Sequence, residues 1–253
     1  MTLPAAPGAE GAARRGELAR NLAAIRVRVA AACQAAGREV GEITLVAVTK
    51  TRPAADALAL IGLGLTDFGE NRDQEAAAKA AAVAETTPAA VSWHFIGQLQ
   101  TNKAHSVVRY ASVVHSVDRV RLVRALGAAA RAAAAARAAA APRELSCLVQ
   151  VSLDSDPSRG GVPVGEIPQV ATAIEAEHGL TLGGMMAVAP LGVPPETAFA
   201  SLRAISATVR EINPAAAIIS AGMSGDLEAA VRNGATHLRI GTALLGNRSL
   251  PVL

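Results

Sequence analysis

Short apolar segments rich in β-branched residues recur eight times along the chain, and each is followed by a stretch with helical periodicity or by a short terminal piece. Such alternation of strands and helices is typical of a parallel sheet that is covered by helices. The chain has 253 residues, close to the usual size of about 250 residues for eight such units closed into a (β/α)8 barrel. The expected strands are 43–49, 66–69, 91–97, 112–117, 145–152, 183–189, 216–220 and 237–241.

We favour this closed TIM barrel over an open, doubly wound sheet. An open sheet that binds dinucleotides carries the pattern G-x-G-x-x-G after its first strand, whereas the turn here reads TKTRP (49–53). Helical periodicity and stop signals predict the helices that follow the strands. They are expected at 53–62, 71–84, 101–108, 118–141, 165–178, 194–212 and 226–233.

An extra helix is expected before the first strand. Apolar residues recur at steps of three and four between Glu17 and Ala36, and Gly37 is a helix stop. Residues 1–13 are mostly Ala, Gly and Pro and have little to bury, so we expect a disordered tail there. The domain organisation is then a tail followed by one barrel domain over 14–253.

Several classes of protein are disfavoured by what the sequence lacks. Its two cysteines, Cys33 and Cys147, supply neither a disulfide framework nor a thiolate metal site. No pair of histidines has metal-ligand spacing beside a carboxylate, so we expect no metal. The first residues contain no apolar signal segment and no apolar run reaches about 18 residues, so we expect a cytoplasmic protein without a membrane span.

Charge and aromatic content argue against nucleic acid as a partner. The net charge is +3, but the basic residues are scattered, and aromatic residues make up only 2% of the chain. Only three of the 24 basic residues are lysines, namely Lys50, Lys79 and Lys103. Because lysine can act as an amine nucleophile and arginine cannot readily do so, each lysine is a candidate for chemistry.

Lys50 immediately follows the first expected strand. In a (β/α)8 barrel, the carboxyl ends of the strands and the loops after them form the working face. The amine of Lys50 is therefore expected at the barrel mouth, above apolar residues, where partial burial favours the free amine that reacts with an aldehyde. A capping or surface lysine is the alternative that position alone leaves open.

The loops after the last two strands are where such barrels commonly hold a phosphate. The first of them reads AGMSGD (221–226), in which two glycines allow close approach of the backbone and Ser224 offers a hydroxyl. The second loop offers Gly241 and Thr242 in the same way. Together these turns indicate a phosphate site, and glycines that serve only tight turns are the alternative.

Arg239 lies between Leu238 and Ile240 in the last strand, so its side chain points to the face opposite theirs. If that face is the barrel interior, the guanidinium needs an acceptor there, because an unpaired buried charge is too costly. A salt bridge between strand and helix is the alternative. An amine, an arginine and phosphate donors at one end of a barrel match the aldehyde, ring nitrogen and phosphate of pyridoxal 5′-phosphate (PLP).

Six segments of the chain together resemble the pyridoxal phosphate homeostasis proteins, whose barrel is of the alanine racemase N-terminal type. They are LVAVTK (45–50), GENRDQE (69–75), WHFIGQLQTNK (93–103), HSVD (115–118), GMMAVAP (184–190) and GMSGDLEAAVRNGATHLRIGTALLG (222–246). They run in order from the first strand to the end of the chain. The resemblance implies a protein that binds PLP and takes part in its homeostasis inside the cell, without known enzymatic turnover.

The same resemblance implies roles for single residues of the cofactor site. Lys50 would form the internal aldimine, a Schiff base with the cofactor, and Arg239 would face the pyridine nitrogen. Ser224, Gly241 and Thr242 would hold the phosphate.

Further residues would complete the pocket. Met223 would lie beside the phosphate, and Asn71 and His94 would line the pocket. Two departures from the family pattern bear on its outer part. The segment SAGMS (220–224) stands where the family more often has Ser-Met-Gly-Met-Ser, and Arg159 stands where a lysine is usual.

We expect a PLP carrier rather than an enzyme, with a PLP-dependent racemase-like enzyme as the alternative. An arginine at the ring nitrogen keeps that nitrogen unprotonated, which makes the ring a poorer electron sink. A racemase with this barrel carries a second base on a separate domain, and the only tyrosine here, Tyr110, precedes the fourth strand. A phosphate-metabolising barrel without a covalent cofactor is a third alternative. We expect a monomer, with apo forms of PLP-dependent enzymes as partners.

Overall fold

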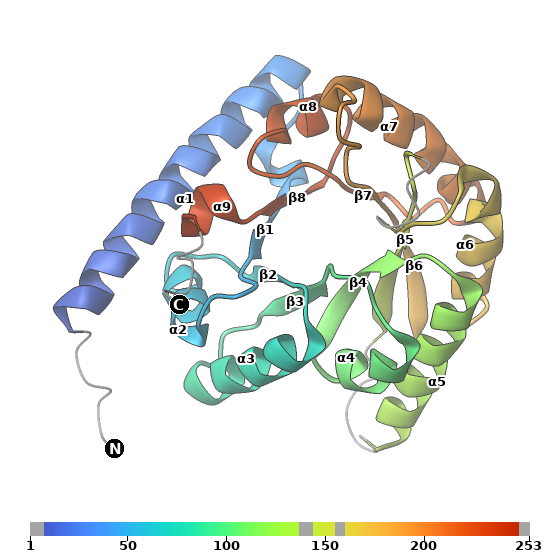
Figure 1. Ribbon diagram of the computed structural model, residues 1–253, viewed down its shortest axis with the longest axis horizontal. Coiled ribbons are helices and arrows are strands. Elements are labelled where there is room, and N and C mark those ends of the chain that lie inside the picture. Colours follow the sequence, from blue (N-terminus) through green and yellow to red (C-terminus); the bar gives the residue numbers. More distant parts are fainter. Residues whose placement is uncertain (1–7, 137–143, 155–159, 248–253) are drawn as a thin grey trace.

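The computed structural model describes residues 8–136, 144–154 and 160–247. In these residues eight parallel strands close into a barrel in chain order, with the last strand paired to the first (Figure 1). The strands are β1 (Thr44–Val48), β2 (Asp67–Glu70), β3 (Ser92–Phe95), β4 (Ala111–Val117), β5 (Leu145–Gln150), β6 (Leu180–Met186), β7 (Ile218–Ser220) and β8 (His237–Ile240). The closed barrel confirms the predicted architecture, and the open-sheet alternative is wrong.

Helices follow the strands and surround the barrel (Figure 1). The α-helices are α1 (Ala9–Ala36), α2 (Ala54–Ile61), α3 (Asp73–Thr86), α4 (Ala104–Tyr110), α5 (Val120–Ala136), α6 (Ile167–Glu175), α7 (Pro195–Ile212), α8 (Leu227–Arg232) and α9 (Thr242–Leu245). Short 3-10 helices are η1 (Val40–Glu42), η2 (Thr101–Lys103) and η4 (Val164–Glu166). Within the described ranges, no helix combines the length and the apolar character needed to cross a membrane.

The main hydrophobic core lies between the barrel and its helices, because parallel strands bury both of their faces. Leu238 and Ile240 of β8 are fully buried in this core. The side chain of Arg239, between them, points the other way, into the barrel, where it bonds to Ser220 of β7. The strand alternation read from the sequence is therefore confirmed at β8.

Helix α1 runs along one side of the barrel, where it passes α2, α9 and α8 (Figure 1). Its predicted apolar stripe is buried: Leu18, Leu22, Ile25 and Val29 are at most 5% exposed. The helix ends where the sequence indicates, at Gly37, whose φ of 63° lies in the left-handed region. The extra N-terminal helix is thus part of the folded domain.

The amino end of α1 differs from the sequence expectation. The helix begins at Ala9, well before its apolar stripe, and so overlaps the tail expected over 1–13. Residues 1–7 lie outside the described residues. Polar contacts hold this end, because the guanidinium of Arg14 donates two hydrogen bonds to the carboxylate of Asp56 on α2, at 3.1 and 2.7 Å. Apolar periodicity does not reveal polar contacts, so it places the start of this helix too late in the sequence.

The start of one strand also differs, and the end of one expected helix is not described. Strand β6 begins at Leu180 rather than at residue 183, because Leu180 and Leu182 are both buried and pair with β5 ahead of the glycines. The helix expected over 118–141 is α5, which is described as far as Ala136. The rest of that segment lies outside the described residues.

Candidate functional site

Lys50 lies just beyond the carboxyl end of β1, on a turn with an unusual backbone. The next residue, Thr51, has a φ of 64°, and it is the only non-glycine residue with positive φ in the described part of the chain. Such a conformation costs about 1–3 kcal/mol and persists only where its surroundings impose it. Here the N–H of Thr51 donates to the carboxylate of Glu75 on α3. The guanidinium of Arg52 donates to the carbonyl of Gly246 at 2.7 Å.

A buried ion pair supports this turn from below. The Nζ of Lys79 donates to the backbone oxygen of Thr49 at 2.7 Å and to Oε1 of Glu70 at 2.5 Å. The hydroxyl of Thr49 donates to the same carboxylate oxygen at 2.6 Å. The side chains of Lys79 and Glu70 are 4% and 0% exposed. Burial raises the pKa of Glu70 above its ordinary value, although the hydrogen bonds from Lys79 and Thr49 oppose this shift.

Lys50 lines a small pocket together with the loop that follows β8. The pocket has a volume of about 50 Å³, and Gly241 and Thr242 form its other side. These residues are far apart in the sequence, and they meet because β1 pairs with β8, with Ala47 opposite Ile240. Closure of the barrel thus brings the predicted amine and one predicted phosphate loop together.

A hydrogen bond joins the loops after β7 and β8. The backbone N–H of Ala243 donates to Oγ of Ser224 at 3.1 Å, which puts Ser224 against the first turn of α9. Gly222 begins the β7 loop with a φ of 89°, and a Cβ there would lie 2.6 Å from Cβ of Ala230 and 2.9 Å from Cδ2 of Leu238. Only glycine fits this position without displacing those neighbours. The two predicted phosphate loops therefore form one continuous structure.

Two other predicted site residues lie on loops at this end of the barrel. Met223, next to Ser224, is 40% exposed, and its backbone N–H donates to Asp226 at 2.5 Å. Asn71 follows β2 directly. Its backbone lies so close to Gly97 that a Cβ on that glycine would be 2.2 Å from the oxygen of Asn71. Asn71 therefore sits beside the loop that follows β3.

The guanidinium of Arg239 is inside the barrel, where the side chain is nearly fully buried. It donates to Oγ of Ser220 at 2.6 Å and to the carbonyl of Ala187 at 2.9 Å. These acceptors are a hydroxyl and a carbonyl rather than a carboxylate. Burial lowers the pKa of Arg239 to about 10, so the side chain still carries its proton at neutral pH.

His94 and His115 pack edge to face inside the barrel. His115 contacts Ser220, the serine that also accepts from Arg239. Nε2 of His94 lies 2.9 Å from Oδ1 of Asp67, and its Nδ1 lies 2.8 Å from Nε2 of His115. Nδ1 of His115 lies 2.9 Å from Oγ of Ser220. Both ring nitrogens of His94 are thus engaged in the interior, and His94 is not among the residues that line the Lys50 pocket.

Comparison with known proteins assigns the chain to a family. The sequence matches the family described as alanine racemase, N-terminal domain, over residues 20–249. It is 46% identical to the pyridoxal phosphate homeostasis protein of Mycobacterium tuberculosis over 247 residues, which cover 94% of this chain and 95% of the relative. The chain belongs to the pyridoxal phosphate homeostasis protein family.

Solved structures agree with this membership. PipY of Synechococcus elongatus, in a structure with PLP bound, is 31% identical to this homeostasis-family chain and superimposes with a TM-score of 0.74, over 90% of this chain and 100% of PipY. Alanine racemase of Corynebacterium glutamicum superimposes with a TM-score of 0.64 at 18% identity, over 94% of this chain and 63% of the racemase. The second likeness shows the barrel fold alone.

Sequence reasoning missed several polar residues of this homeostasis-family barrel. Lys79 was noted only as one of three lysines, although it follows Glu75 by four residues, a spacing that brings the two side chains together on a helix. Asp67 and Ser220 carried no local signal, because their contacts with the histidines are made between strands: Asp67 of β2 contacts His94 of β3, and Ser220 of β7 contacts His115 of β4. Only the folded arrangement connects them.

Proposed function

We propose that this chain binds PLP at the carboxyl end of its barrel and keeps the cofactor available inside the cell, as a homeostasis protein. The observation that carries the proposal is that Lys50 lines the same pocket as Gly241 and Thr242. When bound, PLP supplies an aldehyde that condenses with a primary amine. The names of the relatives and the PLP-bound structure of PipY support this assignment.

The donors at this end of the barrel fit the chemical groups of the cofactor. We assign the amine of Lys50 to the aldehyde, and Ser224, Gly241 and Thr242 to the phosphate. We assign Arg239 to the ring nitrogen. Because Arg239 keeps its proton at neutral pH, a ring nitrogen that faces it accepts a hydrogen bond and stays unprotonated.

We assign the remaining predicted site residues by where they lie. Met223 adjoins the phosphate loop and Asn71 adjoins the β3 loop, so both belong to the wall of the site. His94 acts from behind Arg239, through His115 and the interior hydrogen bonds, rather than by lining the pocket.

We further propose that the protein is a carrier without turnover. An unprotonated ring nitrogen withdraws electrons weakly, which disfavours carbanion chemistry at the cofactor. Tyr110, the only tyrosine, is a poor base, because its hydroxyl faces Asp73 at 3.4 Å and burial raises its pKa. It also lines a pocket between α3 and α4, on the outside of the barrel.

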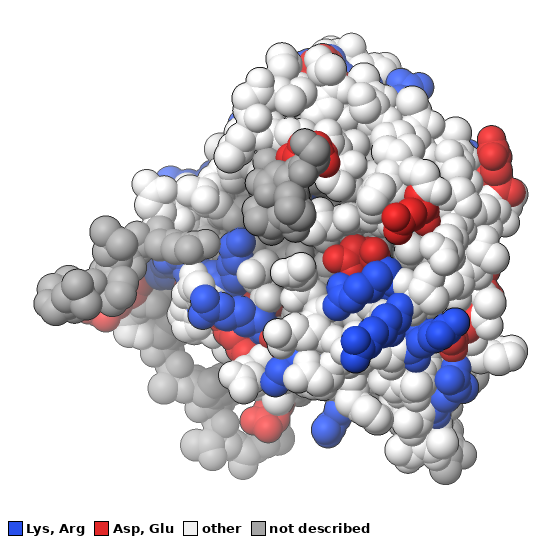
Figure 2. Space-filling view, turned by 45° about the vertical axis from the view of Figure 1, so that its right-hand side comes forward, with Lys and Arg blue, Asp and Glu red and all other residues white. Residues whose placement is uncertain are grey.

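We expect the protein to bind a small cofactor rather than a polyanion. Figure 2 shows basic and acidic side chains lying beside one another on the face that it displays. Arg131 is salt-bridged to Glu177, and Arg232 to Glu196. We propose that the protein is a cytoplasmic monomer and that it delivers PLP to apo forms of PLP-dependent enzymes.

The covalent step is tested by reduction with borohydride and peptide mapping. The protein is incubated with PLP, reduced, digested and analysed by mass spectrometry. We expect one adduct, at Lys50, which is absent from Lys50→Ala. The Lys103→Ala variant, which changes a lysine on η2, keeps the adduct. An adduct at another lysine, or none in the wild-type protein, contradicts the proposal.

The carrier role is tested with the loaded protein. We expect no sustained racemisation of a panel of amino acids by chiral chromatography. We also expect an apo PLP-dependent enzyme to regain activity when it is mixed with the loaded protein under conditions where free PLP is trapped. Multiple turnovers would establish the racemase-like alternative, and failure to reactivate the apo-enzyme would refute delivery.

A further inference from the structure

A line of polar side chains crosses the barrel from the amino end of β2 to Arg239. It runs from Asp67 through His94, His115 and Ser220, with successive contacts of 2.9, 2.8, 2.9 and 2.6 Å. The two histidines, the serine and the arginine are each at most 5% exposed. The side chain of Asp67, at the first position of β2, is 24% exposed. We refer to these five residues as the Asp67–Arg239 chain.

For rings that carry one proton each, the two ends of the Asp67–Arg239 chain set the direction of every hydrogen bond in it. A guanidinium has only donors, so Oγ of Ser220 accepts from Arg239 and its own hydrogen is directed to Nδ1 of His115. Nε2–H of His115 then donates to Nδ1 of His94. Nε2–H of His94 finally donates to the carboxylate of Asp67, which only accepts. In this arrangement each ring carries its one proton on Nε2.

The surroundings of His115 disfavour an extra proton on that ring. Burial, together with His94 and Arg239, holds the pKa of His115 well below its ordinary value. Burial also lowers the pKa of His237, whose ring lies 6.0 Å from that of His94, to about 4. Burial raises the pKa of Asp67, but the hydrogen bonds from His94 and Thr66 outweigh it, so the pKa falls below its ordinary value. A carboxylate therefore remains at the end of the chain.

Interior positions of such barrels are usually filled with Val, Ile and Leu. A polar line in the same place avoids a large cost only when each of its groups is bonded, and the Asp67–Arg239 chain meets that condition. The hydrogen bonds from Arg239 to Oγ of Ser220 and to the carbonyl of Ala187 hold the guanidinium at two of its nitrogens. Two such bonds fix the plane of a flat group.

We propose that Asp67, His94, His115 and Ser220 are positioning residues for Arg239. They fix the plane of its guanidinium so that the N–H groups not bonded inward are presented to an uncharged heteroaromatic nitrogen. This inference rests on the proposed binding of PLP and deepens it. The affinity that the site gains from the ring nitrogen depends on a hydrogen-bond acceptor at position 67, at the opposite end of the barrel.

The direction of the hydrogen bonds in the Asp67–Arg239 chain is tested in the cofactor-free protein. The protein is labelled with 15N-histidine, and the ring nitrogens are assigned by comparison with His94→Gln and His115→Gln. We expect Nε2 to be protonated and Nδ1 to be bare in both rings. A protonated Nδ1 in either ring overturns the proposal. This result does not depend on whether the protein binds PLP.

The effect on the site is tested by comparing the affinity for PLP with that for its carbocyclic analogue, in which C–H replaces the ring nitrogen. Ser220→Ala and Asp67→Leu should reduce the wild-type preference for PLP by about tenfold, which corresponds to about 1.4 kcal/mol. Asp67→Asn keeps an acceptor oxygen and should stay within about twofold of wild type, because one oxygen suffices for His94. The matched control is Asp73→Asn, whose carboxylate faces Tyr110 outside the barrel.

The two proposals fail in distinguishable ways. A wild-type protein that binds both compounds equally, or a preference that survives in Ser220→Ala and Asp67→Leu, overturns the positioning role and leaves the adduct at Lys50 untouched. A protein that forms no adduct with PLP refutes the proposed function. The tautomers of His94 and His115 still show in that case whether the hydrogen bonds of the Asp67–Arg239 chain run in the inferred direction.

Discussion

Thr49 offers both its carbonyl and its hydroxyl to the buried pair of Lys79 and Glu70, and Thr51 is held by Glu75. The residues on both sides of Lys50 are therefore fixed from below. Strand position alone predicted where Lys50 lies, because the last residues of a parallel strand face the barrel mouth. The pair beneath it could not be predicted in the same way, since it joins a strand end to a helix that follows.

At the scale of single residues, we predict that Lys79→Met lowers the free energy of unfolding by about 3 kcal/mol near neutral pH. The change leaves the carboxylate of Glu70 buried without its cation, and removing one partner of a buried pair costs that much. The measurement is urea unfolding followed by circular dichroism. The double variant Lys79→Met/Glu70→Gln should recover part of the loss, because it leaves no buried charge.

This loss should also depend on pH. Burial already places the pKa of Glu70 above its ordinary value, and removal of Lys79 raises it further, so the folded variant binds a proton more tightly than the unfolded chain. Stability then falls as pH rises from the ordinary glutamate range through the folded pKa. The loss in Lys79→Met should therefore be smaller at pH 5 than at pH 8. Equal losses at both values would rule out a charged Glu70 as the cause.

Helix α1 reaches the segments after β7 and β8, which we propose to hold the phosphate, through polar contacts on one side. The amide of Asn21 donates to the carbonyl of Leu244 on α9 at 3.0 Å. The guanidinium of Arg28 donates to the carbonyl of Ser224 at 3.0 Å and forms a salt bridge with Glu228 on α8. The sequence predicted this helix and its apolar stripe, but not these contacts, because Asn and Arg on a helix surface carry no partner information. The added helix thus serves as an anchor for the loops.

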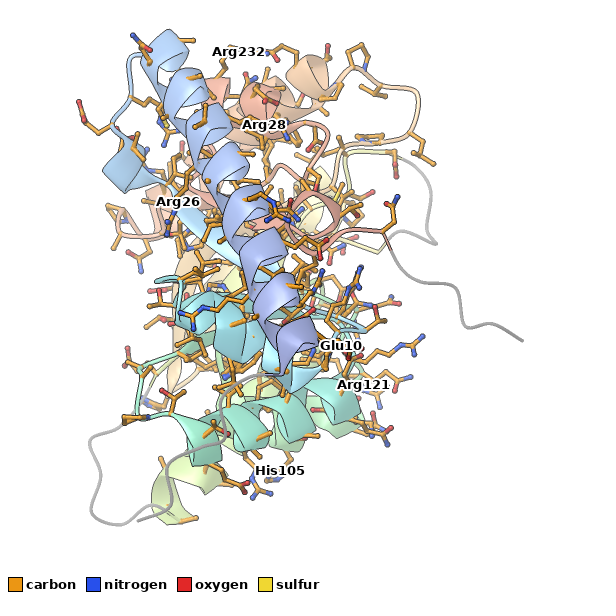
Figure 3. The ribbon with its side chains drawn as sticks, turned by 90° about the vertical axis from the view of Figure 1, so that its left-hand side faces the viewer. Glu10, Arg26, Arg28, His105, Arg121 and Arg232 are labelled. Atoms are coloured by element: carbon orange, nitrogen blue, oxygen red, sulfur yellow. The ribbon has the colours of Figure 1, made fainter. Side chains whose placement is uncertain are left out.

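At the scale of elements, we predict that Arg28→Ala increases amide hydrogen exchange in the loop over 221–226. The free energy of unfolding should change by no more than about 1 kcal/mol, because the pair with Glu228 is only partly buried. The matched control is Arg26→Ala. Arg26 lies on the other side of α1 and donates to Leu63 (Figure 3).

Comparison of the two variants shows whether Arg28 itself anchors the loop over 221–226 or whether α1 supports that loop in another way. Faster exchange in this loop for Arg28→Ala alone is the expected result. Equal exchange in the two variants would show that α1 supports the loop only through its buried apolar stripe.

At the scale of the molecule, the eightfold alternation was enough to predict a closed barrel, because eight strand–helix units of this length have few other ways to cover a sheet. Strand alternation also predicted the inward direction of Arg239, which is a local property. The contacts of His94 carry no local signal, since its partners, Asp67 and His115, lie on other strands, and His115 in turn contacts Ser220 of β7. Sequence patterns thus predicted where Lys50 and Arg239 lie in the barrel better than they predicted the side chains that hold them.

The pairing of β1 with β8 determines when the pocket of Lys50 can form during synthesis. Lys50 is synthesised well before its neighbours Gly241 and Thr242, and only the pairing of β1 with β8 brings them together. A growing polypeptide on the ribosome therefore holds Lys50 without the rest of its pocket until β8 has been made. The proposed loading with PLP has to wait until β8 has been translated, so a nascent copy that lacks β8 withdraws little vitamin from the cell.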